Sequence, residues 1–123
     1  MAFEQATEKI IGCAMAVHSA LGPGLLENAY KECLFYKLSQ FGFYVEKEKA
    51  LPVFFEGIKL DCGYRIDLLV DNNIVIELKC VKNIDDIHLA QILTYMKLGK
   101  YKVGLIINFN VTSLKDGIKR VVI

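Results

Sequence analysis

The two apolar runs of the segment RIDLLVDNNIVIELK, residues 65–79, contain two acidic residues and one lysine. Asp67 belongs to the first apolar run, and Glu77 and Lys79 belong to the second. Side chains two residues apart in a β-strand point to the same side, so Glu77 and Lys79 share a face. Mg²⁺ favours one or two carboxylates, with water and phosphate oxygens completing its ligands. The pattern is therefore typical of a divalent-metal site.

The hairpin that joins the two apolar runs decides whether the acids meet. A three-residue loop at 71–73 lets every apolar residue face an apolar partner across the two strands. The expected pairs are Val70 with Ile74, Leu68 with Ile76 and Ile66 with Leu78. The same register sets Asp67 opposite Glu77, whereas a two-residue loop would set Asp67 opposite Leu78 and mix the faces. The hydrophobic pattern thus predicts that the two carboxylates lie side by side.

Two carboxylates directly opposite each other on neighbouring strands repel each other if both are ionised. A divalent cation, the ammonium group of Lys79, or a raised pKa of one acid would each offset the repulsion. A simpler interpretation is that Asp67 and Glu77 are exposed strand residues and Lys79 is their salt-bridge partner. The very apolar surroundings favour a functional site, because a buried charge without a partner is costly.

The elements that must position these residues follow from the periodicity of the apolar residues. It predicts two helices, over 4–20 and about 25–41, separated by the sequence LGPG. The period then changes to 2 and predicts strands over about 44–55, 58–70 and 74–81. Pro52 places the first strand at a sheet edge or a bulge. A helix capped by Asp85, a buried strand over 102–109, a helical turn near 113–116 and a last strand follow. The chain is expected to be one α/β domain over residues 1–123, in the order α-α-β-β-β-α-β-β.

Two of the predicted helices offer further polar side chains. In the third helix, His88, Gln91 and Tyr95 follow the spacing of one helical face. Gln91 needs hydrogen-bond partners there, which a phosphate, water or Lys79 would supply, whereas His88 is read as a surface residue and Tyr95 as packing before any ligand role. Glu27 lies at the start of the second helix, where it either belongs to the site or only stabilises the helix end.

The composition restricts the function classes. Hydrophobic residues make up 54% and charged residues 24%, enough apolar material for one core. No segment has the length of a membrane helix, and the N-terminus lacks a signal-peptide pattern, so a soluble, cytoplasmic protein with no membrane partner is expected. The net charge of +1 is not that of a protein that coats nucleic acid non-specifically. The four cysteines are too far apart in sequence for a CxxC-type zinc site.

Several separate segments together resemble a known family. The segment GLLENAY, residues 24–30, has the form GxxExxY, and it is preceded by VHSALGPG. The segments YRIDLLVDNNIVIELK, HLAQILTY and LIINF follow in order, and LKDGIKRVVI ends the chain. Over roughly residues 7–123 the chain closely resembles the GxxExxY family, which is grouped with the PD-(D/E)XK nuclease superfamily. The resemblance implies a restriction-endonuclease-like core, with a central mixed sheet flanked by helices, and Mg²⁺-dependent cleavage of phosphodiester bonds.

The resemblance also implies roles for individual residues. Asp67 matches the aspartate of the motif, although Ile66 precedes it where the motif has proline, and Glu77 and Lys79 match the ExK. Glu27 resembles the acid of the first core helix, and Gln91 resembles the helix glutamine of several nuclease branches.

These matches lead to two hypotheses. In the first, the protein is a Mg²⁺- or Mn²⁺-dependent nuclease acting on DNA or RNA, and Asp67 and Glu77 hold the metal with the backbone carbonyl of Leu78. Lys79, Glu27 and Gln91 are then the catalytic residues. In the second, the domain is a catalytically silent metal- or nucleic-acid-binding or assembly module. A homodimer suits either hypothesis, since a small domain gains by pairing its exposed strand edges.

Overall fold

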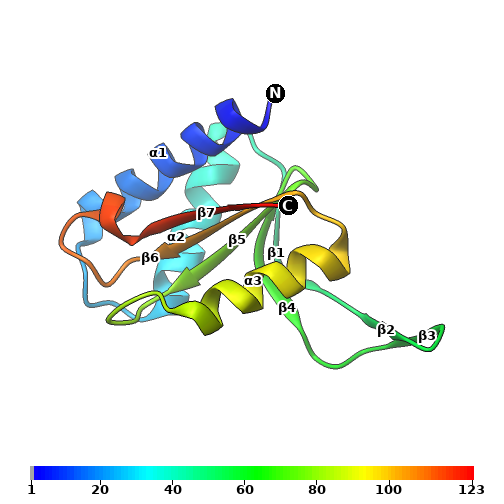
Figure 1. Ribbon diagram of the computed structural model, residues 1–123. Coiled ribbons are helices and arrows are strands. Elements are labelled where there is room, and N and C mark those ends of the chain that lie inside the picture. The colour runs from blue at the N-terminus through cyan, green and yellow to red at the C-terminus, as the bar shows by residue number, and fades with distance from the viewer. Residues whose placement is uncertain (1) are drawn as a thin grey trace.

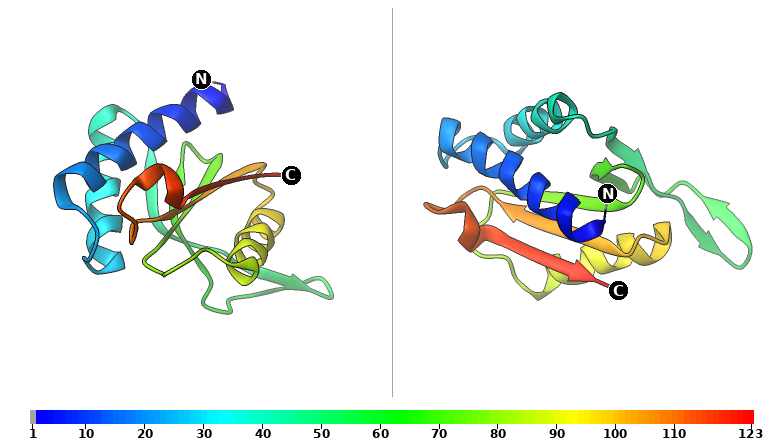
Figure 2. Two further views of the ribbon diagram at one scale, coloured as in Figure 1. Left: turned by 60° about the vertical axis from the view of Figure 1, so that its left-hand side comes forward. Right: turned by 90° about the horizontal axis from the view of Figure 1, so that it is seen from above.

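A computed structural model describes residues 2–123 and shows three layers, with a five-stranded sheet between helices. Helices α1 and α2 cover one face of the sheet, and helix α3 covers the other (Figures 1 and 2). This arrangement confirms the predicted α/β class and the central mixed sheet flanked by helices. The elements in chain order are α1 (Phe3–Leu21), α2 (Glu27–Phe41), β1 (Val45–Ala50), β2 (Val53–Phe55), β3 (Ile58–Leu60), β4 (Arg65–Val70), β5 (Ile74–Lys79), α3 (Asp86–Gly99), β6 (Val103–Asn108), the 3₁₀ turn η1 (Leu114–Gly117) and β7 (Ile118–Val122).

The strand order of the large sheet is β1-β4-β5-β6-β7. Strands β5 and β6 are parallel and are joined through α3, whereas the other neighbours are antiparallel. Strand β6 is buried along its whole length, which confirms the prediction of a strand covered on both faces. Because β4 and β5 are antiparallel, the start of β4 and the end of β5 lie at the same end of the two strands. Asp67, Glu77 and Lys79 lie toward that end.

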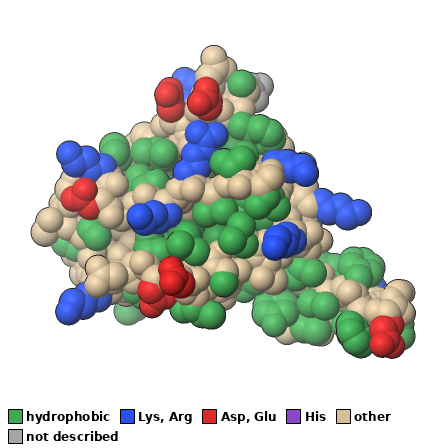
Figure 3. Space-filling model, viewed as in Figure 1, with side chains coloured by type: hydrophobic (Ala, Val, Ile, Leu, Met, Phe, Trp, Pro, Cys, Tyr) green, Lys and Arg blue, Asp and Glu red, His purple; other side chains and the backbone are tan. Residues whose placement is uncertain are grey.

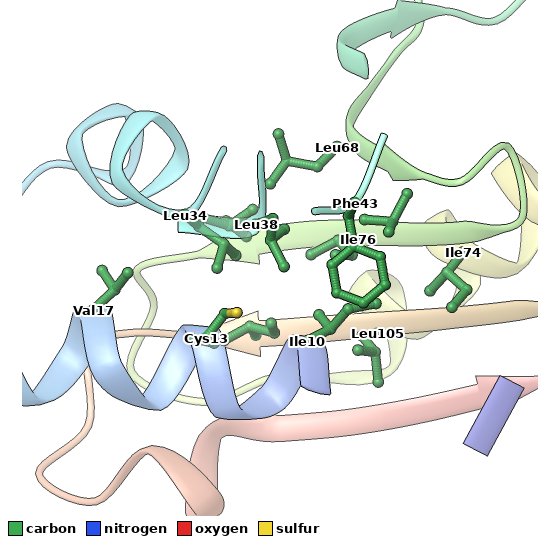
Figure 4. Close-up of a cluster of buried hydrophobic side chains, with 14 of the residues drawn as sticks. Ile10, Cys13, Val17, Leu34, Leu38, Phe43, Leu68, Ile74, Ile76 and Leu105 are labelled. Atoms are coloured by element: carbon green, nitrogen blue, oxygen red, sulfur yellow. The ribbon is translucent and has the colours of Figure 1, made fainter. Parts of the chain in front are cut away.

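The core is divided by the sheet into two clusters of buried side chains. The larger cluster joins α1 and α2 to one face of the sheet, and Ile10, Leu34 and Ile76 point toward one another there (Figure 4). The smaller cluster joins α3 to the other face and contains Val75, Ile92 and Met96, among others. The sheet is therefore held rigidly from both sides. This packing fixes the positions of Asp67, Glu77 and Lys79 on β4 and β5.

Two of the predicted strands are each broken, which corrects their expected bounds. The segment 44–55 divides into β1 and β2 around Pro52, whose ring removes a backbone N–H donor. The segment 58–70 divides into β3 and β4 at a bend that contains Gly63, with φ of 82°. As a result β2 and β3 form a separate two-stranded hairpin that projects from the body of the domain (Figure 1). The prediction that the strand with Pro52 lies at an edge is confirmed, since β1 ends the sheet.

The projecting hairpin carries exposed apolar side chains. Phe54, Phe55 and Ile58 are each at least 60% exposed. Hydrophobic side chains gather along this part of the space-filling surface, whereas Lys and Arg side chains are scattered singly over the same face (Figure 3). The hairpin thus adds apolar surface next to α3. The face of the molecule seen in Figure 3 has no continuous stripe of positive charge.

The predicted register of β4 and β5 is confirmed next to the turn and fails farther from it. Val70 pairs with Ile74 and Leu68 pairs with Ile76, as a three-residue loop requires. The ladder then ends, and Ile66 is not paired with Leu78 as expected. Ile66 also packs in the smaller cluster, on the side opposite to Leu68, so its predicted face is wrong. The reason lies in the intervening residue, Asp67, where side chains replace the backbone ladder.

Within residues 2–123, no helix combines the length and the apolar character that crossing a membrane requires.

Candidate functional site

Asp67 and Glu77 meet where β4 and β5 separate, and each holds the backbone of the opposite strand. The N–H of Asp67 donates to Oε2 of Glu77 at 2.9 Å, and the N–H of Leu78 donates to Oδ2 of Asp67 at 2.9 Å. These two bonds satisfy backbone donors that the interrupted ladder leaves without a carbonyl partner. Glu77 is only 5% exposed and Asp67 is half-buried, so neither acid belongs to a fully solvated strand face. The prediction that the two carboxylates come together is thereby confirmed.

The electrostatics of the pair reflect burial and mutual repulsion. Burial, together with the nearby charge of Asp67, raises the pKa of Glu77 to about 8. Burial also raises the pKa of Asp67, opposed by the hydrogen bond from Leu78 and by the charges of Lys31 and Lys79. In the metal-free protein the repulsion is thus relieved by keeping a proton on Glu77 at neutral pH. A cation that entered the site would displace this proton.

Lys79 is tied to helix α3 rather than to the acids. Its Nζ donates to Oε1 of Gln91 at 3.2 Å, and Nε2 of Gln91 donates to the hydroxyl of Tyr95 at 3.2 Å. Among the described residues, Lys79 forms no salt bridge within 4.0 Å. This overturns the simpler interpretation of an exposed acid pair with Lys79 as its ion-pair partner. Gln91 therefore has the partner that the sequence suggested, and Tyr95 holds Gln91 in place.

The start of α2 brings two more charged side chains near the acids. Glu27 is the first residue of α2 and is exposed, and its charge contributes to raising the pKa of Glu77. Lys31 lies one turn later, where its charge lowers the pKa of Asp67, and it forms a 3.1 Å salt bridge with Glu48. Sequence analysis missed Lys31, although its i+4 spacing from Glu27 places both on one helix face.

The segment GLLENAY acquires a structural explanation. The hydroxyl of Tyr30 donates to the carbonyl of Gly22 and accepts from the N–H of Leu25 at 3.1 Å. Its fully buried ring stacks on Phe109, with 4.5 Å between the ring centroids. Gly24 has φ of 102°, a conformation that side chains other than glycine rarely adopt. The tyrosine and the glycine thus fix the turn that places Glu27, the first residue of α2, near Glu77 on β5.

We expect Tyr30→Phe to lower the free energy of unfolding by about 1–3 kcal/mol, because it leaves two backbone groups of the turn without their buried partner. Urea denaturation followed by circular dichroism measures this change. Tyr36→Phe is the matched control, since Tyr36 is on the same helix and 64% exposed. A change of less than about 0.5 kcal/mol for Tyr30→Phe, the range of ordinary surface substitutions, would contradict the anchoring role.

Two other polar residues stabilise the elements around the site. Asn108 is buried at the end of β6 and bonds both the N–H and the carbonyl of Val81, at 3.1 and 2.8 Å. It fixes the chain two residues after Lys79, a role that sequence analysis missed. His88 accepts from the N–H of Asp85 and completes the capping box of α3. The sequence predicts a surface histidine at this position, and the structure makes it half-buried. The prediction that Asp85 caps this helix is confirmed.

The carboxylates of Asp67 and Glu77 on β4 and β5 fit a hard divalent cation. Oδ1 of Asp67 and Oε1 of Glu77 receive no hydrogen bond from the described residues, so each carboxylate keeps one oxygen for a ligand. Within residues 2–123 no group of three or more His, Cys, Asp or Glu side chains is arranged to hold a metal ion, so Glu27 does not complete a cage. Two carboxylates suit Mg²⁺, which commonly keeps several waters and takes its remaining ligands from substrate phosphates.

Comparison with known protein families agrees with this geometry. A family model described as the PD-(D/E)XK nuclease superfamily matches residues 4–121, nearly the whole chain. The chain belongs to the PD-(D/E)XK nuclease superfamily. Searches of curated proteins and of solved structures found no match. Members of this superfamily typically use a divalent metal. In this member Asp67 and Glu77 are joined through hydrogen bonds to backbone N–H groups across β4 and β5, and Lys79 follows on β5.

Proposed function

We propose that this superfamily member is a Mg²⁺-dependent phosphodiester hydrolase that acts on DNA or RNA and that also accepts Mn²⁺. The observation that carries the proposal is the pairing of the buried carboxyl of Glu77 with the half-buried carboxyl of Asp67 at a break in the sheet, with Lys79 two residues farther along the same strand. Placing two acids together away from water costs free energy unless a proton or a cation offsets their charge.

The residues of the site divide the work as follows. Asp67 and Glu77, with the backbone carbonyl of Leu78, would hold the metal. The bound metal supplies positive charge that polarises a phosphate oxygen and lowers the pKa of a coordinated water. Lys79 donates from its ammonium group to the charge that develops on the phosphate and orients the attacking water. Gln91 holds Lys79 in position, and Glu27 acts through water or a second ion from the start of α2.

We also assign the chain to the GxxExxY family within the superfamily. The support is that Gly24 and Tyr30 both shape the turn before α2, and that Glu27 is the first residue of the helix that follows this turn. Two of the three spaced residues thus meet structural requirements of one turn.

One observation favours the alternative, a catalytically silent metal- or nucleic-acid-binding or assembly module. The two carboxylates each bond a backbone N–H across the strand break, so they stabilise the fold even without chemistry. A homodimer remains compatible with both functions, because β1 and β7 leave the two edges of the described sheet open to a second copy. Light scattering measures the molecular mass in solution. A mass equal to that of one chain would contradict the homodimer.

The experiment that tests the nuclease is a cleavage panel of single- and double-stranded DNA and RNA, with Mg²⁺, with Mn²⁺ and with EDTA. We expect cleavage that requires the metal and is lost in Glu77→Ala. Equal behaviour of the wild type and Glu77→Ala at high protein concentration would overturn the enzymatic function. Calorimetric titration with Mg²⁺ and with short oligonucleotides then identifies the alternative, since metal binding without oligonucleotide binding favours the module.

A further inference from the structure

An apolar pocket of about 580 Å³ lies along α3 on the side that faces the projecting hairpin. Its volume falls within the range of about 300–1,000 Å³ that is usual for small-molecule sites. The residues that matter for its chemistry are Tyr64, Ile87, His88, Gln91, Thr94 and Tyr95. None of the residues that line it carries the charge of a lysine, an arginine, an aspartate or a glutamate. The pocket is thus made for a neutral group and not for a phosphate.

The pocket is linked to the site of Asp67, Glu77 and Lys79 through Gln91. Gln91 lines the pocket and at the same time accepts from Nζ of Lys79 through Oε1. Tyr95 also lines the pocket, and its pKa is raised by burial and by the charge of Glu77. A molecule whose phosphate lies at Lys79 therefore has the pocket as its immediate neighbour.

The walls of the pocket suit a flat aromatic group. The rings of Tyr64 and Tyr95 pack against each other, with centroids 5.8 Å apart and planes inclined by 57°. Tyr95 is buried and Tyr64 is 43% exposed, so Tyr64 is the aromatic ring that is accessible to a ligand. Ile87 adds apolar surface, while Gln91 and Thr94 provide hydrogen-bonding groups along the helix. Aromatic side chains with a few polar groups are how proteins hold unpaired bases.

We propose that this pocket binds an unpaired nucleobase of the strand being cleaved, so that the substrate is single-stranded nucleic acid. The proposal rests on the phosphodiesterase function and names its substrate class. A base inside a duplex is stacked and paired, and it reaches such a pocket only after leaving the helix. The net charge of +1 gives weak attraction to a duplex backbone, so base stacking supplies the affinity that phosphate contacts do not.

Fluorescence anisotropy in EDTA, which prevents turnover, tests the pocket with oligonucleotides of about 12 residues, within the usual site size for single strands. The probes are single-stranded DNA, single-stranded RNA, a duplex of the same length and a base-free deoxyribose-phosphate oligomer. We expect either single strand, or both, to bind more tightly than the duplex and the base-free oligomer. We expect Tyr64→Ala to weaken binding of the preferred single strand by about tenfold, the typical effect of losing one stacking partner. Tyr64→Phe keeps the ring and is expected to bind like the wild type.

Two controls separate stacking from a general disturbance. Tyr36→Ala removes an exposed tyrosine from α2, on the other side of the sheet, and should leave binding unchanged. The base-free oligomer should respond equally to wild type and Tyr64→Ala, because it has no base to stack. Three results would each overturn the proposal that the pocket binds a base. These are equal affinities for single strand, duplex and base-free oligomer, no effect of Tyr64→Ala, and no binding of any probe.

The failure of this proposal differs from the failure of the nuclease. Tyr64-dependent binding without metal-dependent cleavage would contradict the nuclease and support the pocket. Metal-dependent cleavage with binding that Tyr64→Ala leaves unchanged would contradict the pocket and support the nuclease.

Discussion

Replacing Glu77 by glutamine is expected to lower metal-dependent cleavage by about 10²–10³-fold, a loss typical of a group that stabilises the transition state. The glutamine occupies the same space, and its carbonyl oxygen can still accept from the N–H of Asp67, so the strand break should keep its geometry. What the substitution removes is the negative charge that a cation needs. The loss therefore reports on the metal site and not on the fold.

The measurement is initial-rate cleavage of the best substrate of the panel, together with calorimetric titration of Mg²⁺ without substrate. Glu8→Gln is the matched control, because Glu8 is an exposed glutamate on α1. We expect Glu8→Gln to keep both activity and Mg²⁺ binding, and Glu77→Gln to lose both. Retention of Mg²⁺ binding by Glu77→Gln would show that this carboxylate is not a ligand.

Glu77→Gln is also expected to stabilise the metal-free protein at alkaline pH by about 5 kcal/mol. The folded-state pKa of Glu77 is about 8, above its ordinary value of 4.5. Below pH 4.5 the carboxyl is protonated in both the folded and the unfolded chain and has no effect on stability. Between 4.5 and 8 the unfolded chain binds fewer protons, so this residue makes stability fall as the pH rises, and above 8 the full penalty is present.

Urea denaturation in EDTA at pH 4.5, 7 and 9 measures this linkage. The stability difference between Glu77→Gln and the wild type should be small at pH 4.5 and grow toward pH 9. Added Mg²⁺ should stabilise the wild type at pH 9 and leave the variant unchanged, because only the wild type offers the ionised acid. A difference that does not vary with pH would contradict the raised pKa of Glu77.

The sequence was sufficient where the deciding interactions are local. The three-residue loop and the alternation of apolar residues place Leu68 opposite Ile76, and the structure agrees. The cap at Asp85 likewise depends on neighbouring backbone N–H groups only. The same local rules failed at Ile66, because alternation assumes an unbroken ladder and the side chain of Asp67 interrupts it.

By itself the sequence determined that Asp67, Glu77 and Lys79 lie on the two strands of one hairpin, since the loop length and the alternation of apolar residues are local properties. Only the tertiary structure decided what surrounds them. It places Lys31 near Asp67, ties Lys79 to Gln91, leaves Glu27 exposed outside any closed cage, and opens a pocket beside α3. These features depend on how helices distant in sequence pack on the two faces of the sheet. Periodicity shows which side of a helix is buried. It does not show which strand the end of that helix approaches.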